Sequence, residues 1–152
     1  MTNDIALLHL SAPIDFKTYT YLQPACLPVQ GLSTNGSRCM AIGWGVSSLD
    51  PNAPDTSILQ EAPLPTISQT YCKSRYTDYD PNLQLCAGYI QGGIATCSGD
   101  SGGPLLCPFS NGVWVVEGIV SYHVGECADP NYPPVFTRVY GYLSWIKSIT
   151  GL

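Results

Sequence analysis

The stretch Cys97-Ser98-Gly99-Asp100-Ser101-Gly102-Gly103-Pro104-Leu105-Leu106 places a serine among glycines, between a cysteine and an apolar run. A serine hydroxyl is a weak nucleophile at neutral pH, so an enzyme that uses one needs a neighbouring base and backbone N–H groups directed at the oxyanion. Glycine permits the backbone angles that turn such groups into one hollow, which makes Gly99 and Ser101 candidate donors. A Gly-Ser surface turn is the alternative. The flanking cysteines and the apolar run favour a pinned, half-buried nucleophile loop.

The composition predicts one turn-rich β domain. The chain has 152 residues, of which 11% are charged, with 15 glycines and 13 prolines, and this balance argues against long salt-bridged helices. The net charge of -5 argues against nucleic acid or an anionic membrane as a partner, since either favours a basic face. No apolar run is long enough to cross a bilayer, and the first residues do not form a signal peptide.

The chain contains seven cysteines without a CxxC pair, so disulfides in an oxidising compartment are expected rather than zinc or thioredoxin-like chemistry. They are Cys26, Cys39, Cys72, Cys86, Cys97, Cys107 and Cys127. An odd number leaves one thiol free or bonded to another chain. We expect no metal and no cofactor. The cysteine content is typical of a secreted protein, but the sequence does not begin with a signal peptide. We therefore expect that the sequence lacks its true beginning.

Apolar runs bounded by glycine and proline predict short strands. A strand buried on both faces is expected at Asp4–Leu10, and further strands at Cys39–Gly45, Leu59–Ile67 and Val113–Tyr122. Prolines 63 and 65 place the third of these at an edge or a bend of the sheet.

Two helices are expected. A short one begins near Ile67 with Ser68 as its N-cap. Tyr142, Trp145, Ile146 and Ile149 repeat at helical spacing, which predicts an amphipathic terminal helix that docks on the core.

Several motifs occur together and in order along the whole chain. They are Asn3-Asp4-Ile5-Ala6-Leu7-Leu8, Gly43-Trp44-Gly45, Cys86-Ala87-Gly88-Tyr89, Gly99-Asp100-Ser101-Gly102-Gly103-Pro104, Gly118-Ile119-Val120-Ser121 and Ser144-Trp145-Ile146. This set resembles the trypsin-like (chymotrypsin-type, S1) serine peptidases. The resemblance implies an all-β fold: the last part of a first β-barrel, a complete second barrel and a C-terminal α-helix. The chain would then be one partial peptidase domain, 1–152, with 1–24 from the first barrel, 25–37 a connector, 38–139 the second barrel and 140–152 the helix.

The resemblance also implies catalytic roles. Ser101 is similar to the nucleophile, and Gly99 and Ser101 to the oxyanion-hole donors. Asp4 is similar to the buried carboxylate that orients the catalytic imidazole, and Ser121 to the serine beside that carboxylate. Asp100 is similar to the residue that pairs with the new amino terminus after activation. A solvated Asp4 and an Asx-turn Asp100 are the alternatives.

The catalytic histidine of such enzymes lies upstream of the segment that begins at Asp4, and this chain contains only His9 and His123. His9 is expected to be an exposed side chain. His123 is expected along the rim of the substrate pocket, where it would replace the missing base only if its geometry allowed. The 152 residues alone are therefore expected to be inactive.

By the same resemblance, the disulfides pair Cys39 with Cys107, Cys72 with Cys86, and Cys97 with Cys127. Cys26 is left without a partner in the chain. It would tether the domain to a segment that precedes the activation site.

The resemblance places Ala95 where a trypsin has an aspartate, so a preference for Arg or Lys is not expected. Side chains at His123 and Pro134 should make the pocket shallow, which favours small aliphatic residues. A blocked pocket is the alternative. The other pocket residues would be Thr96, Ser98, Ser121 and Tyr122.

These observations predict an extracellular serine endopeptidase that acts on polypeptides in its full-length form. Protein inhibitors of proteases and the segment tethered through Cys26 are the further partners expected. A non-catalytic homologue that serves as a binding or regulatory module is the alternative. A disulfide-rich β scaffold unrelated to peptidases is a third interpretation. Neither nucleic acid nor membrane is expected as a partner.

Overall fold

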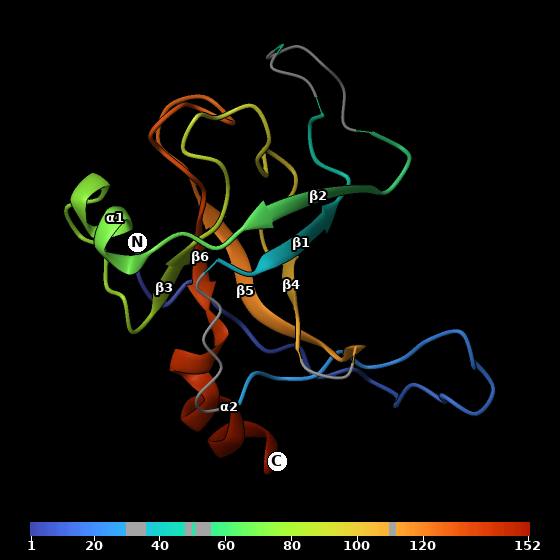
Figure 1. Cartoon of the computed structure of the whole chain (residues 1–152). Helices are drawn as coiled ribbons and strands as arrows, with labels where there is room; N and C mark the ends of the chain where they lie inside the picture. The colour runs from blue at the N-terminus through green and yellow to red at the C-terminus, as the bar shows by residue number, and fades with distance from the viewer. Residues whose placement is uncertain (30–35, 48–49, 51–55, 110–111) are drawn as a thin grey trace.

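The computed structural model describes residues 1–29, 36–47, 50, 56–109 and 112–152. Within them, six strands form one sheet in the order β2-β1-β4-β5-β6-β3, and all neighbours are antiparallel (Figure 1). The strands are β1 Arg38–Gly43, β2 Gln60–Pro65, β3 Gln84–Cys86, β4 Pro104–Pro108, β5 Trp114–Tyr122 and β6 Val135–Arg138. The helices are α1 Gln69–Arg75, the 3-10 turn η2 Val139–Tyr142 and α2 Leu143–Thr150.

The two end strands of this order, β2 and β3, also meet. An antiparallel bridge joins Thr66, just after β2, to Ala87, just after β3. The N–H of Gly88 donates to the carbonyl of Pro65 at 2.8 Å beside it. The sheet therefore closes on itself, and the fold is an all-β antiparallel barrel with a terminal helix.

The barrel interior is filled by alternate side chains of its strands. Leu64, Leu105 and Phe136 are 0% exposed and belong to one cluster that every strand of the sheet contributes to. Gly118 lies where two strands approach closely, because a Cβ atom there would lie 2.9 Å from the Cβ atom of Phe136. Small and large residues thus alternate across the interior to give close packing.

Most predicted elements are present within a few residues of the expected bounds. β1, β2 and β5 occupy three of the predicted strand stretches, and β2 stands at one end of the sheet order. α1 begins after Ser68, whose hydroxyl accepts from the N–H of Tyr71 at 3.3 Å. These elements were predictable because their signals are local.

The predicted buried strand at Asp4–Leu10 is wrong. These residues have no regular structure, and all except Ile5 are exposed, with Leu8 89% exposed. A strand is stabilised by hydrogen bonds to a neighbouring strand. Among the described residues no strand lies beside this stretch, so its apolar side chains do not enter a core.

The terminal helix docks with fewer side chains than its spacing predicted. Tyr142 and Ile146 are buried, whereas Trp145 is 38% and Ile149 63% exposed. α2 covers residues 143–150 only, because the preceding turn is a 3-10 helix. A 3-10 helix turns by a different angle per residue than an α-helix, so Tyr142 is not in phase with Trp145 and Ile149.

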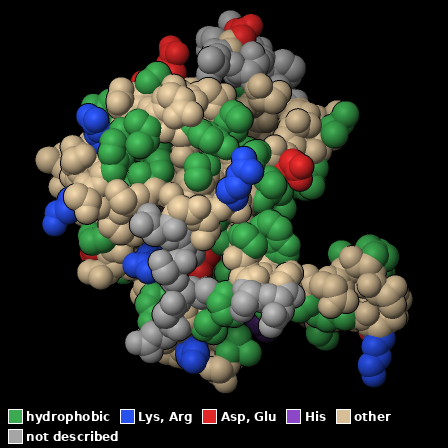
Figure 2. Space-filling view, viewed as in Figure 1, with side chains coloured by type: hydrophobic (Ala, Val, Ile, Leu, Met, Phe, Trp, Pro, Cys, Tyr) green, Lys and Arg blue, Asp and Glu red, His purple; other side chains and the backbone are tan. Residues whose placement is uncertain are grey.

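Residues 1–29 run beside the barrel as an irregular segment. Cys26 makes a parallel bridge with Val115 of β5, and its carbonyl accepts from the N–H of Val116 at 2.9 Å. Part of the segment stands away from the body with hydrophobic side chains on its surface (Figure 2). Exposed ones include Leu10, Ile14, Phe16, Tyr19, Tyr21 and Leu22. Positions 30–35 of the predicted connector lie outside the described residues.

Candidate active site

Ser101 lies on a glycine-containing loop just before β4, and its side chain is exposed. Gly99 and Gly102 have φ angles of 93° and 80°, which only glycine adopts readily. Hydrogen bonds from Gly102 N–H to Val120 and from Val120 N–H to Gly103 fix the loop on β5, at 3.0 and 2.9 Å. The N–H groups of Gly99 and Ser101 donate to no group among the described residues. Both donors are therefore free to bind an oxygen placed beside Ser101.

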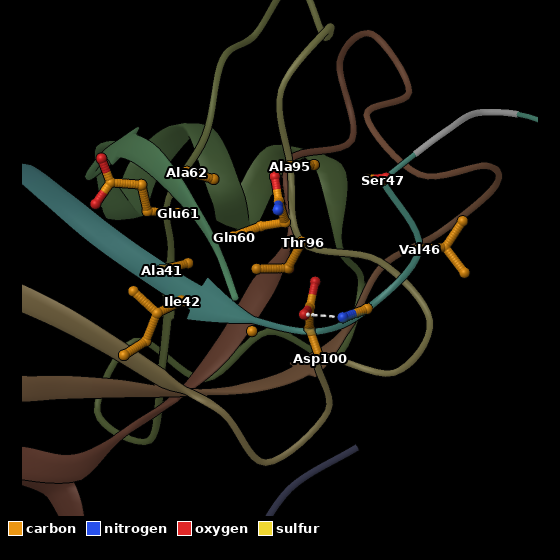
Figure 3. Close-up of a pocket in the computed structure, with 12 residues that line it drawn as sticks. Ala41, Ile42, Val46, Ser47, Gln60, Glu61, Ala62, Ala95, Thr96 and Asp100 are labelled. Carbon is orange, nitrogen blue, oxygen red and sulfur yellow. Dashed lines mark hydrogen bonds between the residues drawn. The ribbon is translucent and has the colours of Figure 1, made fainter. Parts of the chain in front are cut away.

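The carboxylate of Asp100 is bound by two backbone N–H groups. Its Oδ1 accepts from the N–H of Gly45 at 2.9 Å (Figure 3). Its Oδ2 accepts from the N–H of Cys97, also at 2.9 Å. A Cβ atom at Gly43 would overlap this carboxylate, and one at Gly45 would lie 2.6 Å from its Cγ. The glycines of the Gly-Trp-Gly motif thus make room for Asp100.

A cavity of about 160 Å³ borders the Asp100 carboxylate. Residues of β1, β2 and the loop that carries Ala95 and Thr96 line it (Figure 3). A different cavity lies beside Ser101, and Thr96 lines both of them.

Asp4 lies against Ser121, whose hydroxyl donates to Asp4 Oδ2 at 2.7 Å. The resemblance implied a buried carboxylate, but Asp4 is exposed in this structure. The main chain of Asp4 is held as well, since Thr137 Oγ1 donates to the Asp4 carbonyl at 2.7 Å. Sequence reasoning missed Thr137; a polar residue within a buried strand was its available signal.

The second cavity, of about 180 Å³, opens beside Ser101. Its lining includes five residues assigned to the substrate pocket from the sequence: Thr96, Ser98, Ser121, Tyr122 and His123. Two others lie elsewhere. Ala95 lines the cavity beside Asp100, and Pro134 is buried, with its carbonyl accepting from the N–H of Ala87 at 3.4 Å. These positions follow from the paths of the loops, which the sequence did not fix.

The two histidines lie in different surroundings. His9 is exposed on the irregular segment. His123 lines the cavity beside Ser101, with its Nε2 3.6 Å from the Sγ atom of Cys127. Its Nδ1 is buried, and no described residue bonds to it. The ring thus contacts the disulfide, and among the described residues no hydrogen bond joins it to Ser101. Beside it, burial raises the pKa of the Tyr122 hydroxyl above its ordinary value.

Three disulfides stabilise the barrel: Cys39–Cys107, Cys72–Cys86 and Cys97–Cys127. These are the pairs that the resemblance implied. The third joins the Ser101 loop to the loop after β5, so it holds both walls of the second cavity. Cys26 is an exposed free thiol.

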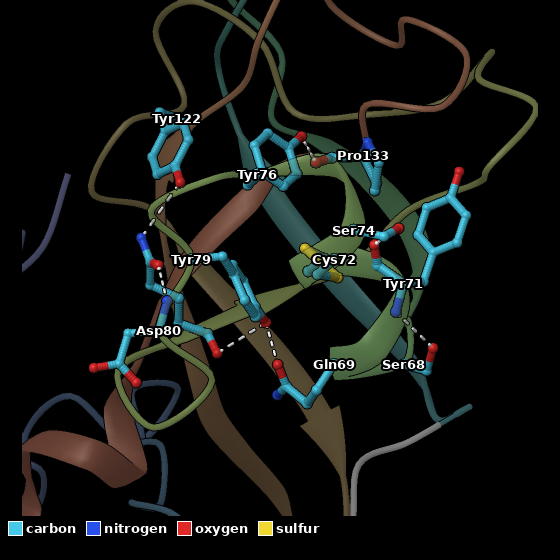
Figure 4. The surroundings of a disulfide bond; sticks show 12 residues. Ser68, Gln69, Tyr71, Cys72, Ser74, Tyr76, Tyr79, Asp80, Tyr122 and Pro133 are labelled. Carbon is cyan, nitrogen blue, oxygen red and sulfur yellow. Dashed lines mark hydrogen bonds between the residues drawn. A yellow bond between two sulfur atoms is a disulfide. The ribbon is translucent and has the colours of Figure 1, made fainter.

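Tyrosines surround the Cys72–Cys86 disulfide (Figure 4). The Tyr76 hydroxyl donates to the carbonyl of Pro133 at 2.5 Å, and the Tyr79 hydroxyl contacts the carboxamide oxygen of Gln69. Burial raises the pKa of both hydroxyls above the ordinary tyrosine value. They remain protonated donors and act as part of the core.

Within the ranges that the structure describes, no cluster of three or more His, Cys, Asp and Glu side chains is arranged to hold a metal ion. None of the helices in those ranges has both the length and the apolar character needed to cross a bilayer.

Comparison with known proteins covers nearly the whole chain. The family model described as Trypsin matches residues 1–146. The chain is also 39% identical over 143 residues to the rat (Rattus norvegicus) protein named transmembrane protease serine 9. This match covers 94% of the chain but 13% of the relative. The chain therefore spans a small part of the length of this curated relative.

Proposed function

The chain belongs to the trypsin family of serine peptidases, and from this premise we propose that it forms the nucleophile-bearing part of a serine endopeptidase. The observation that carries the proposal is the exposed Ser101 beside two unused N–H donors, those of Gly99 and Ser101 itself. Ser101 Oγ would attack the carbonyl carbon of a peptide bond while these donors bind the oxyanion. The C–N bond then breaks, the amine leaves with the proton that Ser101 lost, and water hydrolyses the acyl ester.

The proton must pass through a base, and we propose a histidine from outside these 152 residues. His9 is exposed on the irregular segment, and His123 faces the Cys97–Cys127 disulfide. Asp4 would orient the imidazole from its position against Ser121. On this view residues 1–24 belong to the first of two barrels, and the described barrel is the second.

Asp100 is proposed as the activation switch. Its carboxylate already borders a cavity of about 160 Å³, and a positively charged amino terminus placed there would pair with it. Without that partner the carboxylate accepts from two backbone N–H groups of Gly45 and Cys97. Neither bond comes from the N–H two residues further on, so they do not form the Asx turn considered as the alternative role.

The substrate side chain next to the cleaved bond is proposed to be small and aliphatic. The cavity beside Ser101 is about 180 Å³, and no aspartate or glutamate is among the described residues that line it. A lysine or arginine side chain would therefore find no counter-charge there. The volume of the cavity and the His123 ring at its wall both favour a short side chain.

The three disulfides support an extracellular location for the domain. The exposed thiol of Cys26 supports a covalent link to a preceding segment of the protein. Polypeptide substrates and protein inhibitors would share the cavity beside Ser101.

A fluorophosphonate tests the proposal, because it reacts with an activated serine and not with an ordinary one. The native protein should be labelled at Ser101, and the Ser101→Ala variant should not. Absence of labelling in the natively purified protein would favour the non-catalytic homologue. The 152-residue chain should be assayed separately for labelling and for peptide cleavage. Absence of both in this chain would show that it depends on a histidine supplied from elsewhere.

A further inference from the structure

We propose that Thr137 and Tyr142 are positioning residues that fix Asp4 from the barrel. The inference rests on the role proposed for Asp4 and adds how that carboxylate is held in place. Asp4 belongs to residues 1–5, which contact the barrel and which we call the docked segment. Beyond Ile5, the chain is exposed and irregular as far as residue 25.

The hydroxyl of Tyr142 binds Asn3 of the docked segment both as a hydrogen-bond acceptor and as a donor. The hydroxyl accepts from the Asn3 N–H at 3.0 Å and donates to Asn3 Oδ1 at 3.1 Å. Asn3 has a φ of 59°, a left-handed conformation that asparagine tolerates better than most residues. Because Tyr142 is 8% exposed, its hydroxyl would lack partners if Asn3 moved away. The residue before Asp4 is thus fixed in both position and conformation.

Thr137 binds Asp4 itself. Its side chain lies on β6, is 3% exposed and donates to the Asp4 carbonyl at 2.7 Å. Its cross-strand neighbour Gln84 is also 3% exposed and donates through Nε2 to the Met1 carbonyl at 2.7 Å. Buried polar side chains in strands are costly unless they are paired, and both find their acceptors in the docked segment.

The next residue, Ile5, packs against the cluster formed by Val139, Tyr142 and Ile146. Asp4 is therefore bounded by Asn3, which binds Tyr142, and by Ile5, which packs in an apolar contact. Its own carbonyl is bound from β6 and its carboxylate from Ser121 of β5. The barrel therefore contacts Asp4 at both its main chain and its carboxylate.

This arrangement matters for catalysis because a displacement of about 1 Å in a positioned group costs up to about 100-fold in rate. A merely stabilising role would predict loss of global stability without loss of order at Asp4. A positioning role predicts loss of order at Asp4 without a comparable loss of global stability.

The first test measures backbone ¹⁵N order parameters in the 152-residue chain. Tyr142→Phe keeps the ring and Thr137→Val keeps the shape, and each removes one hydroxyl. The order parameter of Asp4 should fall from about 0.85 towards 0.6 or below in both variants. Thr137→Ser and Tyr140→Phe are the matched controls and should leave it unchanged. An Asp4 that stays as ordered as in the wild type in both hydroxyl-deleted variants overturns the proposal.

The second test uses a form of the protein that labels with fluorophosphonate and cleaves peptides. Tyr142→Phe should lower kcat by about tenfold or more with KM unchanged, and Thr137→Ser should restore what Thr137→Val loses. An unchanged kcat with a raised KM would overturn the positioning role. If no form cleaves peptides, the proposed function fails, while the order parameters still decide whether the barrel holds Asp4.

Discussion

The barrel of residues 38–138 and the irregular segment of residues 1–29 contain similar apolar side chains. Many of these side chains are buried in the barrel, whereas most are exposed in the segment. Phe136 of the barrel is 0% exposed, whereas Leu8 of the segment is 89% exposed. The barrel strands have neighbours on the sheet, and its two end strands also meet. The segment is attached mainly at its ends, through residues 1–5 and Cys26. Burial in this molecule therefore follows the availability of a neighbouring strand rather than the hydrophobicity of a stretch.

The largest expected difference between the two regions comes from truncating one apolar side chain in each. Phe136→Ala should lower the free energy of unfolding by about 3–5 kcal/mol, because it leaves a cavity in a closed core. Leu8→Ala should change it by less than about 0.5 kcal/mol, as at most exposed sites. Denaturant titration of both variants measures the contrast. A loss of several kcal/mol for Leu8→Ala would mean that the segment is buried in solution.

The Ser101 loop offers a smaller effect within the barrel. Asp100→Ala leaves the N–H groups of Gly45 and Cys97 without their acceptor, which should cost about 1–3 kcal/mol of unfolding free energy. Asp78→Ala removes an exposed carboxylate and is the matched control. Equal stability of the two variants in thermal or denaturant unfolding would show that these two bonds do not hold the loop.

A buried carboxyl on β5 predicts a dependence on pH. Glu117 is 3% exposed, and burial raises the pKa of its carboxyl, opposed in part by the charge of Arg138. The folded chain therefore keeps this proton to higher pH than the unfolded chain does. The stabilisation is present below the unfolded pKa and is lost as pH rises through the folded pKa.

Glu117→Gln should remove this loss, so its unfolding free energy should exceed that of the wild type at neutral pH and fall less from acid to neutral pH. Unfolding curves measured at several values from pH 4 to 8 provide the test. Glu61→Gln, on an exposed position of β2, controls for the loss of one negative charge. Parallel pH profiles for the wild type and Glu117→Gln would contradict the prediction.

The smallest effects concern one side-chain cap in each region. Ser68 caps α1, so Ser68→Ala should cost about 1 kcal/mol of global stability.

Asp15 accepts from the N–H of Lys17 at 2.9 Å and from Thr18 Oγ1 at 2.7 Å. Asp15→Ala should disorder this turn, visible in its chemical shifts, without a measurable change in global unfolding. A change in global stability would couple the segment to the barrel.

The same contacts fix how that turn responds to acid. The hydroxyl of Thr18, followed by the N–H of Lys17, lowers the pKa of the Asp15 carboxyl. The turn is therefore supported above the unfolded pKa of this group, and the support is lost as pH falls through the folded pKa.

Local signals predicted much of the barrel. Each of these signals affects the backbone within only a few residues, so the sequence alone reveals it. They are the glycines around Ser101, the N-cap at Ser68 and the prolines of β2. The Asp4–Leu10 strand failed because a strand depends on a partner that local sequence does not reveal. The bond from Thr137 to Asp4 joins residues 133 positions apart, and nothing near either residue indicates the other. Ala95 and Pro134 were assigned to a pocket whose walls depend on the paths of whole loops.

The contact that closes the barrel also has a consequence for the order of folding. Near the join of β2 to β3, the Cys72–Cys86 disulfide spans 14 residues, whereas Cys39–Cys107, between β1 and β4, spans 68. Closing the longer loop costs about 1.4 kcal/mol more in chain entropy. The join of β2 to β3 can therefore form early from neighbouring parts of the chain. The pairing of β1 with β4 would be a late step, and the Ser101 loop, which leads into β4, would take its final shape with it.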